Sequence, residues 1–288
     1  MNDRIGVITS FRPEGGTLKH VADFGLKVCQ VCSWTPAHFT EAAADQLRRE
    51  AEESGVRITS LWAGWPGPAV WDFVDGPATL GLVPAAYRRE RVEALKQAAA
   101  FAHRAGLPAI VTHLGFIPEN PRDPVFGEAV AAVREIAEVL RDTKMEFWFE
   151  TGQETPVTML RLIREVGTGN LGVNLDPANL ILYGKANPID ALDVFGSCVR
   201  GIHAKDGMYP TDPMKLGHEV KVGQGKVKFP EFVRRLESLG FHGAYIIERE
   251  ISGEQQRRDI ADTAAYLGRL LGRTRRRLRD GGSRPRPK

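Results

Sequence analysis

The chain has 288 residues, of which 42% are hydrophobic and 26% charged, a balance that supports a large core and excludes a disordered chain. Its apolar runs are short, its three cysteines are too few for a disulfide scaffold, and its first residues lack a signal-peptide pattern, so we expect a cytoplasmic protein without membrane spans. The formal charge of +3 is concentrated in residues 273–288, which hold seven arginines and one lysine; the remaining 31 basic and 35 acidic residues give a net charge of −4. We therefore expect one folded domain at 1–272 and a short, basic, disordered tail at 273–288.

Short runs rich in β-branched and aromatic residues alternate along the chain with longer amphipathic stretches. The short runs predict strands at 4–9, 27–32, 57–62, 109–113, 146–150, 171–175, 199–204 and 244–248. Helical periodicity predicts helices at 36–53, 84–105, 124–142, 157–166, 189–195, 229–239 and 254–271. Proline near the expected helix starts and glycine near the ends support these bounds.

Eight strands that alternate with helices over about 270 residues predict an α/β fold, a single (β/α)8 TIM barrel. The alternative is a doubly wound open sheet. The first strand is followed by SFRPEGGTL, however, and not by the glycine-rich fingerprint of such sheets. In a barrel the catalytic residues lie at the carboxyl ends of the strands, so the functional site is expected there.

Residues that commonly bind metals occur at the ends of four successive predicted strands: Glu150, Asp176, His203 and Glu248. A lone acid at a strand end is usually a helix cap or an ion-pair partner, but four such positions in a row predict a shared site. Two glutamates, one aspartate and one histidine form an oxygen-rich donor set. We expect one divalent metal ion, with Mn²⁺ first and Mg²⁺, Co²⁺ or Zn²⁺ as alternatives, and no nicotinamide or flavin.

Five segments carry a resemblance to a known group of enzymes: FETGQETP (149–156), NLDPANL (174–180), GIHAKD (201–206), VGQG (222–225) and IIERE (246–250). The chain resembles the sugar phosphate isomerase/epimerase superfamily with the xylose-isomerase-like barrel, which includes ketose 3-epimerases, inosose dehydratases and endonuclease-IV-like enzymes. The resemblance covers about residues 4–270. It implies that Glu150, Asp176, His203 and Glu248 hold one divalent cation. Glu250 lies on the same strand face as Glu248, but the IIE pattern favours Glu248.

The resemblance implies a metal-dependent isomerase or epimerase of carbohydrate metabolism, acting on a keto-sugar or sugar phosphate through an enediolate. Glu150 and Glu248 would then remove and return the proton as catalytic residues. The chain departs from ketose 3-epimerases at Asn179, where they carry a histidine, and near Lys205, where they carry an arginine. A dehydratase or lyase acting on a keto-polyol such as an inosose needs the same metal and first step, and is the alternative. A non-catalytic barrel used for binding is the second alternative.

Side chains at or near the strand ends are candidates for binding a carbohydrate substrate through hydrogen bonds or flat rings: His113, Lys205, Asn179, Trp34 and Trp62. His113, Trp34 and Trp62 also suit a structural role at the barrel rim, and Lys205 could instead pair with an acid. Cys29 and Cys32 form a C-x-x-C string, but residues three apart in a strand point to opposite faces, so a redox pair is not expected. Gly223 and Gly225 fit a tight turn better than a phosphate site. We expect no membrane or nucleic-acid partner, and a possible homodimer or homotetramer.

Overall fold

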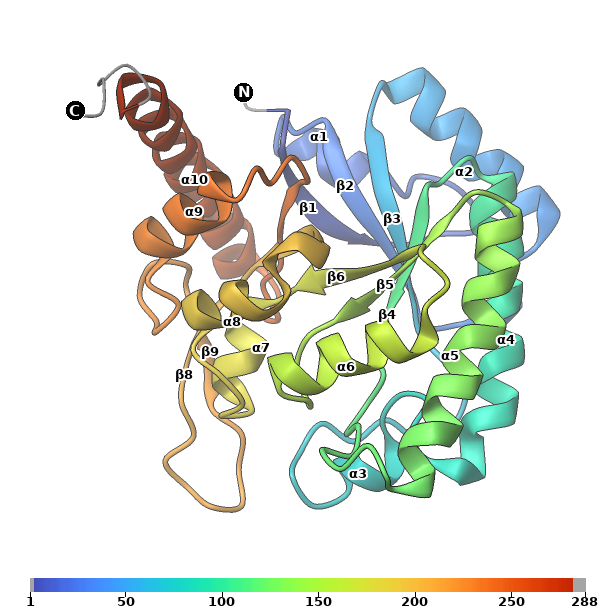
Figure 1. Ribbon diagram of the computed structural model, residues 1–288. Helices are drawn as coiled ribbons and strands as arrows, with labels where there is room; N and C mark the ends of the chain where they lie inside the picture. The colour runs from blue at the N-terminus through green and yellow to red at the C-terminus, as the bar shows by residue number, and fades with distance from the viewer. Residues whose placement is uncertain (1–2, 282–288) are drawn as a thin grey trace, which may run out of the picture.

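The computed structural model describes residues 3–281, and its centre is a closed barrel of eight parallel strands (Figure 1). The order around the barrel is β1-β10-β7-β6-β5-β4-β3-β2, which confirms the predicted (β/α)8 fold. Each strand begins and ends within one residue of the prediction. The strands are β1 (Ile5–Ser10), β2 (Val28–Ser33), β3 (Arg57–Ala63), β4 (Ala109–Thr112), β5 (Glu146–Glu150), β6 (Leu171–Leu175), β7 (Val199–Ala204) and β10 (Tyr245–Ile247).

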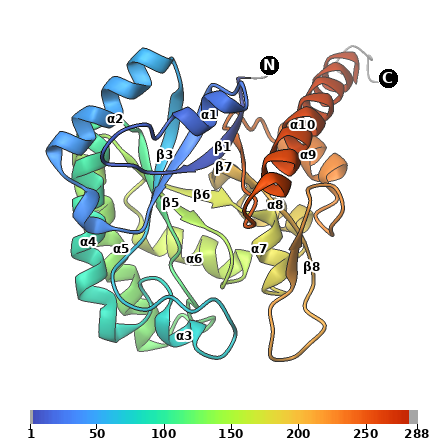
Figure 2. The same ribbon diagram turned by 180° about the vertical axis from the view of Figure 1, so that it is seen from behind.

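Helices surround the barrel in both views (Figures 1 and 2). They are α1 (Lys19–Asp23), α2 (Glu41–Ser54), α3 (Gly76–Thr79), α4 (Ala85–Arg104), α5 (Pro124–Asp142), α6 (Pro156–Val166), α7 (Pro177–Leu182), α8 (Pro188–Phe195), α9 (Phe229–Ser238) and α10 (Glu254–Gly281). The short helices α1, α3 and α7 were not predicted. The predicted helix at 36–53 is divided into a 3-10 turn, Pro36–His38, and α2, because the Thr40 side chain caps α2 by accepting a hydrogen bond from the Ala43 N–H.

Helix α10 extends into the segment that the sequence predicts to be a disordered tail. Residues 273–281 are helical, which corrects that part of the expectation, whereas residues 282–288 lie outside the described part of the chain. The buried side chains of Leu267, Leu270, Leu271 and Thr274 follow helical spacing, so the face of α10 that packs on the barrel continues past residue 273.

Two excursions stand at the carboxyl end of the barrel in both views (Figures 1 and 2). One is residues 64–84, which link β3 to α4 and include α3. The other is an antiparallel hairpin of β8 (Asp206–Met208) and β9 (His218–Val220), which follows β7 and was not predicted. No helix within residues 3–281 is long and apolar enough to cross a membrane.

The apolar core has two layers. A large cluster that includes Phe147 and Phe149 packs between strands and helices. Inside the barrel are two smaller clusters, one that includes Trp62, Val111 and Trp148 and one of Val28, Ala244 and Ile246. Trp148 precedes Glu150 by two residues on β5, so both side chains lie on the inner face of the barrel. The inner apolar layer therefore supports the polar residues at the strand ends.

Candidate metal centre

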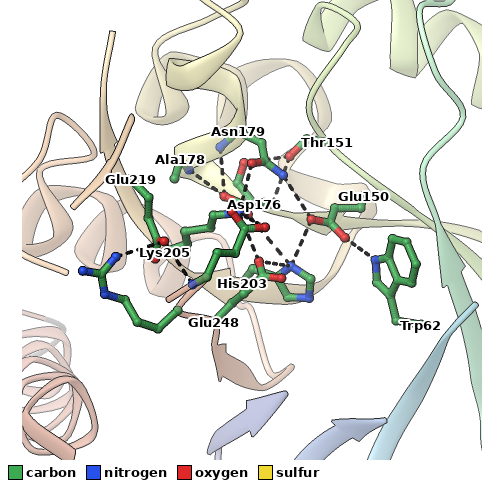
Figure 3. Close-up of polar contacts among 12 residues, drawn as sticks. Trp62, Glu150, Thr151, Asp176, Ala178, Asn179, His203, Lys205, Glu219 and Glu248 are labelled. Atoms are coloured by element: carbon green, nitrogen blue, oxygen red, sulfur yellow. Dashed lines mark hydrogen bonds and ion pairs between the residues drawn. The ribbon is translucent and has the colours of Figure 1, made fainter. Parts of the chain in front are cut away.

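The strand-end residues Glu150, Asp176, His203 and Glu248 meet at the carboxyl end of four adjacent strands. Glu150 is the last residue of β5, Asp176 follows β6, His203 lies in β7 and Glu248 follows β10. Each offers one ligand atom, and these atoms all lie within 4.8 Å of one another. Figure 3 shows the carboxylates converging beside the imidazole of His203. Glu250 is outside this group.

Asp176 is fixed by the start of α7. Its Oδ1 accepts hydrogen bonds from the backbone N–H groups of Ala178 (2.7 Å) and Asn179 (3.0 Å). Its own backbone N–H and C=O both bond to the hydroxyl of Thr151, at 2.9 and 2.8 Å. Its Oδ2 is buried and has no hydrogen-bond partner among the described residues. One oxygen therefore holds the helix, and the other is available to a ligand.

His203 is oriented by a chain of hydrogen bonds from β2 and β3. Its Nε2 lies 2.7 Å from Oε1 of Gln30, whose amide Nε2 donates to the Ser60 hydroxyl at 3.0 Å. Because the Gln30 amide nitrogen is committed to Ser60, its oxygen accepts from the Nε2–H of His203. Nδ1 then faces Oε1 of Glu150 at 3.1 Å and Oε2 of Glu248 at 3.2 Å.

Glu150 is held by donors on three sides. The indole N–H of Trp62 donates to Oε2, and the amide of Asn179 donates to Oε1 at 3.1 Å. Nε2 of His113 lies 3.4 Å from the same Oε1. Burial alone raises the pKa of this carboxyl, but His203 and His113 outweigh burial and hold the pKa well below its usual range.

Lys205 is the buried cation of the site. Its Nζ lies 2.9 Å from Glu250, 3.5 Å from Glu248 and 3.7 Å from Asp176, and it donates to Oδ1 of Asn179 at 3.4 Å. Burial lowers the pKa of Lys205, but the surrounding carboxylates outweigh burial and raise it well above its usual value. The lysine is therefore charged at neutral pH, and Glu250 serves as its partner.

The four residues fit a divalent cation. Three carboxylates and one imidazole form a donor set that suits Mn²⁺, Mg²⁺, Co²⁺ or Zn²⁺. Oδ2 of Asp176, which accepts no hydrogen bond within the described residues, lies 4.0 Å from Nδ1 of His203. Oε1 of Glu150 and Oε2 of Glu248 lie 3.1 and 3.2 Å from the same nitrogen. The hydrogen bond from His203 to Gln30 is the outer contact that a metal-binding histidine normally makes.

A cavity of about 440 Å³ opens onto this centre. Its lining contains the five candidate substrate-binding residues, namely His113, Lys205, Asn179, Trp34 and Trp62. Sequence reasoning missed Trp71 and Tyr183, which also line the cavity, and Gln30 behind His203. A polar side chain within the apolar strand segment VCQVCS is unusual, and this pattern could have identified Gln30. Trp71 lies in a segment without regular periodicity, so no sequence pattern marked it.

Two further sequence features have structural roles. The buried carboxylate of Asp206 accepts hydrogen bonds from the backbone N–H groups of Gly207, Gly223, Gly225 and Val227, at 2.9 to 3.1 Å. The backbone N–H groups of the turn around Gly223 thus bind the carboxylate of Asp206, as a structural contact within the protein. Cys29 lies in the core and Cys32 lines the cavity, on opposite faces of β2 as expected, and both are free thiols.

Comparison with known proteins agrees with this architecture. Residues 18–270 match the profile of the family described as "Xylose isomerase-like TIM barrel". The solved structure of a xylose isomerase domain protein from Planctomyces limnophilus is 33% identical, with a TM-score of 0.89 over 95% of this chain and 99% of that one. The uncharacterized protein MJ1311 of Methanocaldococcus jannaschii is 24% identical over 174 residues, which span 57% of this chain but only 58% of that protein.

More distant structures share the fold. An L-ribulose 3-epimerase is 16% identical, with a TM-score of 0.73 over 98% of this chain and all of that one. A probable 3-DHS dehydratase from Bacillus anthracis is also 16% identical, with a TM-score of 0.65 over 92% of this chain and 99% of that one. Epimerase and dehydratase chemistry thus both occur on barrels similar to this one.

Proposed function

Since the chain belongs to the family of xylose isomerase-like TIM barrels, we propose that it is a divalent-metal-dependent isomerase or epimerase of a keto-sugar, acting by proton transfer. The observation that carries this proposal is the placement of Glu150 and Glu248. They come from β5 and from the end of β10, which β6 and β7 separate in the barrel, and both line the cavity. Each approaches the same imidazole nitrogen of His203.

Glu150 and Glu248 are the groups that move the proton. Two carboxylates on different sides of a substrate carbon can remove a proton from one face and return one to the other, which is what epimerisation requires. Glu150 is oriented for this by Trp62 and Asn179. A divalent cation held by Glu150, Asp176, His203 and Glu248 would supply electrostatic stabilisation of the negative charge that develops on the carbonyl oxygen.

Lys205 and His113 suit the binding of the substrate's oxygens. Both are buried, both line the cavity, and each lies beside one of the two glutamates. The charged ammonium of Lys205 donates hydrogen bonds to an oxygen near Glu248. His113 does the same for a hydroxyl near Glu150. The two residues thus hold the substrate between the carboxylates.

Deuterium incorporation tests the proposal. The protein with Mn²⁺ is incubated in D₂O with free and phosphorylated ketoses and with inososes, and the products are examined by NMR and mass spectrometry. We expect deuterium at the carbon next to the carbonyl in both epimers, and no conversion of one epimer into the other with Glu150→Gln or Glu248→Gln, since an amide cannot accept the proton. Glu231→Gln, at an exposed position on α9, is the control and retains exchange.

The same experiment separates the alternatives. A product that has lost water and absorbs as an unsaturated ketone indicates a dehydratase with the same first step. Absence of solvent deuterium from every substrate, with metal bound, contradicts proton-transfer chemistry and favours a barrel used only for binding.

A further inference from the structure

The side of the cavity next to β2 and β3 is aromatic, in contrast to the charged side formed by the metal-ligand candidates. Four tryptophans make up this tryptophan wall: Trp34 after β2, Trp62 in β3, and Trp65 and Trp71 in the excursion 64–84. The ring centre of Trp34 lies 4.8 Å from that of Trp62, 5.2 Å from Trp65 and 6.2 Å from Trp71. These separations are those of rings in direct contact.

The wall has two buried members and two exposed ones. Trp62 and Trp65 are 5% and 3% exposed, whereas Trp34 and Trp71 are 42% and 39% exposed and line the cavity. Large aromatic faces open to a concave site usually contact a ligand, because leaving them in water is unfavourable. The two buried rings therefore support a surface that the two exposed rings present to the cavity.

The exposed rings are separated from Glu150 by one ring each, Trp34 by Trp62 and Trp71 by His113, whose ring centre lies 5.0 Å from that of Trp71. Trp62 donates its indole N–H to Glu150, so its ring is adjacent to a proposed catalytic carboxylate. Trp34 packs against Trp62 and is one ring further from Glu150. A sugar whose reacting carbon lies between Glu150 and Glu248 leaves the outer faces of Trp34 and Trp71 for a group attached to that sugar.

The wall is preorganised by two features. A Cβ at Gly64 would lie 2.5 Å from the ring of Trp34, so the glycine allows the indole to lie on the backbone. Arg91, fully buried in α4, donates to the carbonyl oxygens of Pro66, Pro68, Thr79 and Gly81, at 2.7 to 3.2 Å, and its guanidinium lies 5.3 Å from the ring of Trp65. A preformed surface binds a ligand without the cost of ordering the loop.

We propose that Trp34 and Trp71 form a second subsite that stacks on a ring joined to the keto-sugar, so that the substrate is a keto-disaccharide or a similar glycoside. The inference rests on the proposed function. The face of a pyranose ring that carries C–H bonds packs on an indole, and the attached ring is uncharged. Among the described residues that line the cavity, the carboxylates and the lysine, Glu150, Lys205, Glu248 and Glu250, lie at the end of β5 and in the segments that follow β7 and β10 rather than in the wall.

Binding measurements with three sugars test the inference. The probes are D-fructose and two glucosyl-fructoses linked through O4 or O6, maltulose and isomaltulose, titrated calorimetrically into the Mn²⁺-loaded protein. We expect at least one disaccharide to bind about tenfold more tightly than fructose. Trp34→Ala and Trp71→Ala should each weaken disaccharide binding about three- to tenfold, and fructose binding less than twofold.

Val157→Ala, at an exposed position on α6 that does not line the cavity, is the matched control and leaves both affinities unchanged. Trp34→Phe should recover part of the disaccharide affinity, and thermal unfolding of each variant verifies its fold. Equal losses for fructose and the disaccharides, no preference for a disaccharide, or no binding of any probe would overturn the inference.

The deuterium-exchange experiment distinguishes failure of this inference from failure of the proposed function. Exchange in fructose without preference for a disaccharide leaves the proposed function standing and rejects the second subsite. Tighter, Trp34-dependent binding of a disaccharide without exchange in any substrate supports the subsite and rejects proton transfer.

Discussion

The cavity has two sides that are stabilised by different means. The acidic side, formed by the metal-ligand candidates and Lys205, depends on ion pairs, whereas the tryptophan wall depends on hydrogen bonds to backbone groups behind it. On the acidic side, the buried cation Lys205 is surrounded by three carboxylates, of which Asp176 and Glu248 are metal-ligand candidates and Glu250 is not. Behind the tryptophan wall, the buried cation Arg91 is surrounded by backbone carbonyl oxygens and lies outside the cavity lining. A charge held by other charges suits a site whose partners change during a reaction. A buried cation bonded to backbone carbonyl groups suits a permanent contact, and we call this contact the Arg91 clamp.

The largest expected effect concerns the acidic side. Asp176→Asn keeps an oxygen that caps α7 but removes the negative charge of the carboxylate. We expect the dissociation constant for Mn²⁺, measured by calorimetry, to rise more than about 100-fold, while the thermal unfolding temperature stays close to that of the wild type. Asp142→Asn, at an exposed position at the end of α5, is the control. Full metal occupancy in Asp176→Asn would exclude Asp176 as a ligand.

The next effect concerns the clamp behind the tryptophan wall. Arg91→Met removes the donors to four carbonyl oxygens of the excursion 64–84. We expect the free energy of unfolding, measured in urea, to fall by about 3 kcal/mol, because buried acceptors lose their partners. Arg89→Met, two residues away at a position where the side chain is 72% exposed, should cost less than about 1 kcal/mol. Equal losses in the two variants would show that Arg91 is no clamp.

The buried carboxyl group of Glu154 gives a pH-dependent effect. Burial raises the pKa of Glu154 to about 7 from a usual value of 4.5. Between these values the folded state holds a proton that the unfolded state releases, so the stability that Glu154 contributes falls as pH rises from 4.5 to 7. Relative to Glu154→Gln, the wild type should lose up to about 3 kcal/mol across this range. Urea unfolding at several pH values measures this loss.

An exposed glutamate provides the control for this titration. Glu53→Gln should follow the wild type at every pH, because that side chain is exposed at the end of α2. Parallel stability curves for the wild type and Glu154→Gln would contradict the assignment of a raised pKa to Glu154.

The smallest expected effect concerns the orientation of His203. Gln30→Leu removes the acceptor that fixes its Nε2–H, so the Mn²⁺ dissociation constant should rise about 10- to 100-fold. Gln30→Glu restores an acceptor and should recover most of the affinity. If the Gln30→Leu and Gln30→Glu variants bind Mn²⁺ with equal affinity, Gln30 does not position His203.

The acidic side was easier to predict from the sequence than the aromatic side. Glu150, Asp176 and His203 occupy strand ends, and regular alternation of strands and helices brings such ends together whatever the intervening loops do. Gln30 and Arg91 act through partners distant in the sequence. Gln30 bonds to Ser60 and His203. Arg91 bonds to backbone carbonyl groups between Pro66 and Gly81. No local pattern marks such pairings.

The loops also limited prediction. The β8–β9 hairpin and the excursion 64–84 are long connections whose form depends on long-range contacts. Trp71 lies in one of these segments and could be placed only once the fold was known. The continuation of α10 past residue 273 was missed because charge dominates that segment, whereas the buried Thr274 shows that helical packing extends into it.

The carboxylate of Asp206 has a consequence for how this barrel can change over evolutionary time. Loops after the seventh and eighth strands of TIM barrels often bind phosphate through backbone N–H groups. Here the N–H groups of Gly223, Gly225 and Val227 are already bonded to Asp206. An aspartate codon becomes a glycine codon by one nucleotide change, and that change would leave the three donors without their internal acceptor. The backbone donors of this loop are thus already used within the chain, and one mutation at Asp206 would remove their acceptor.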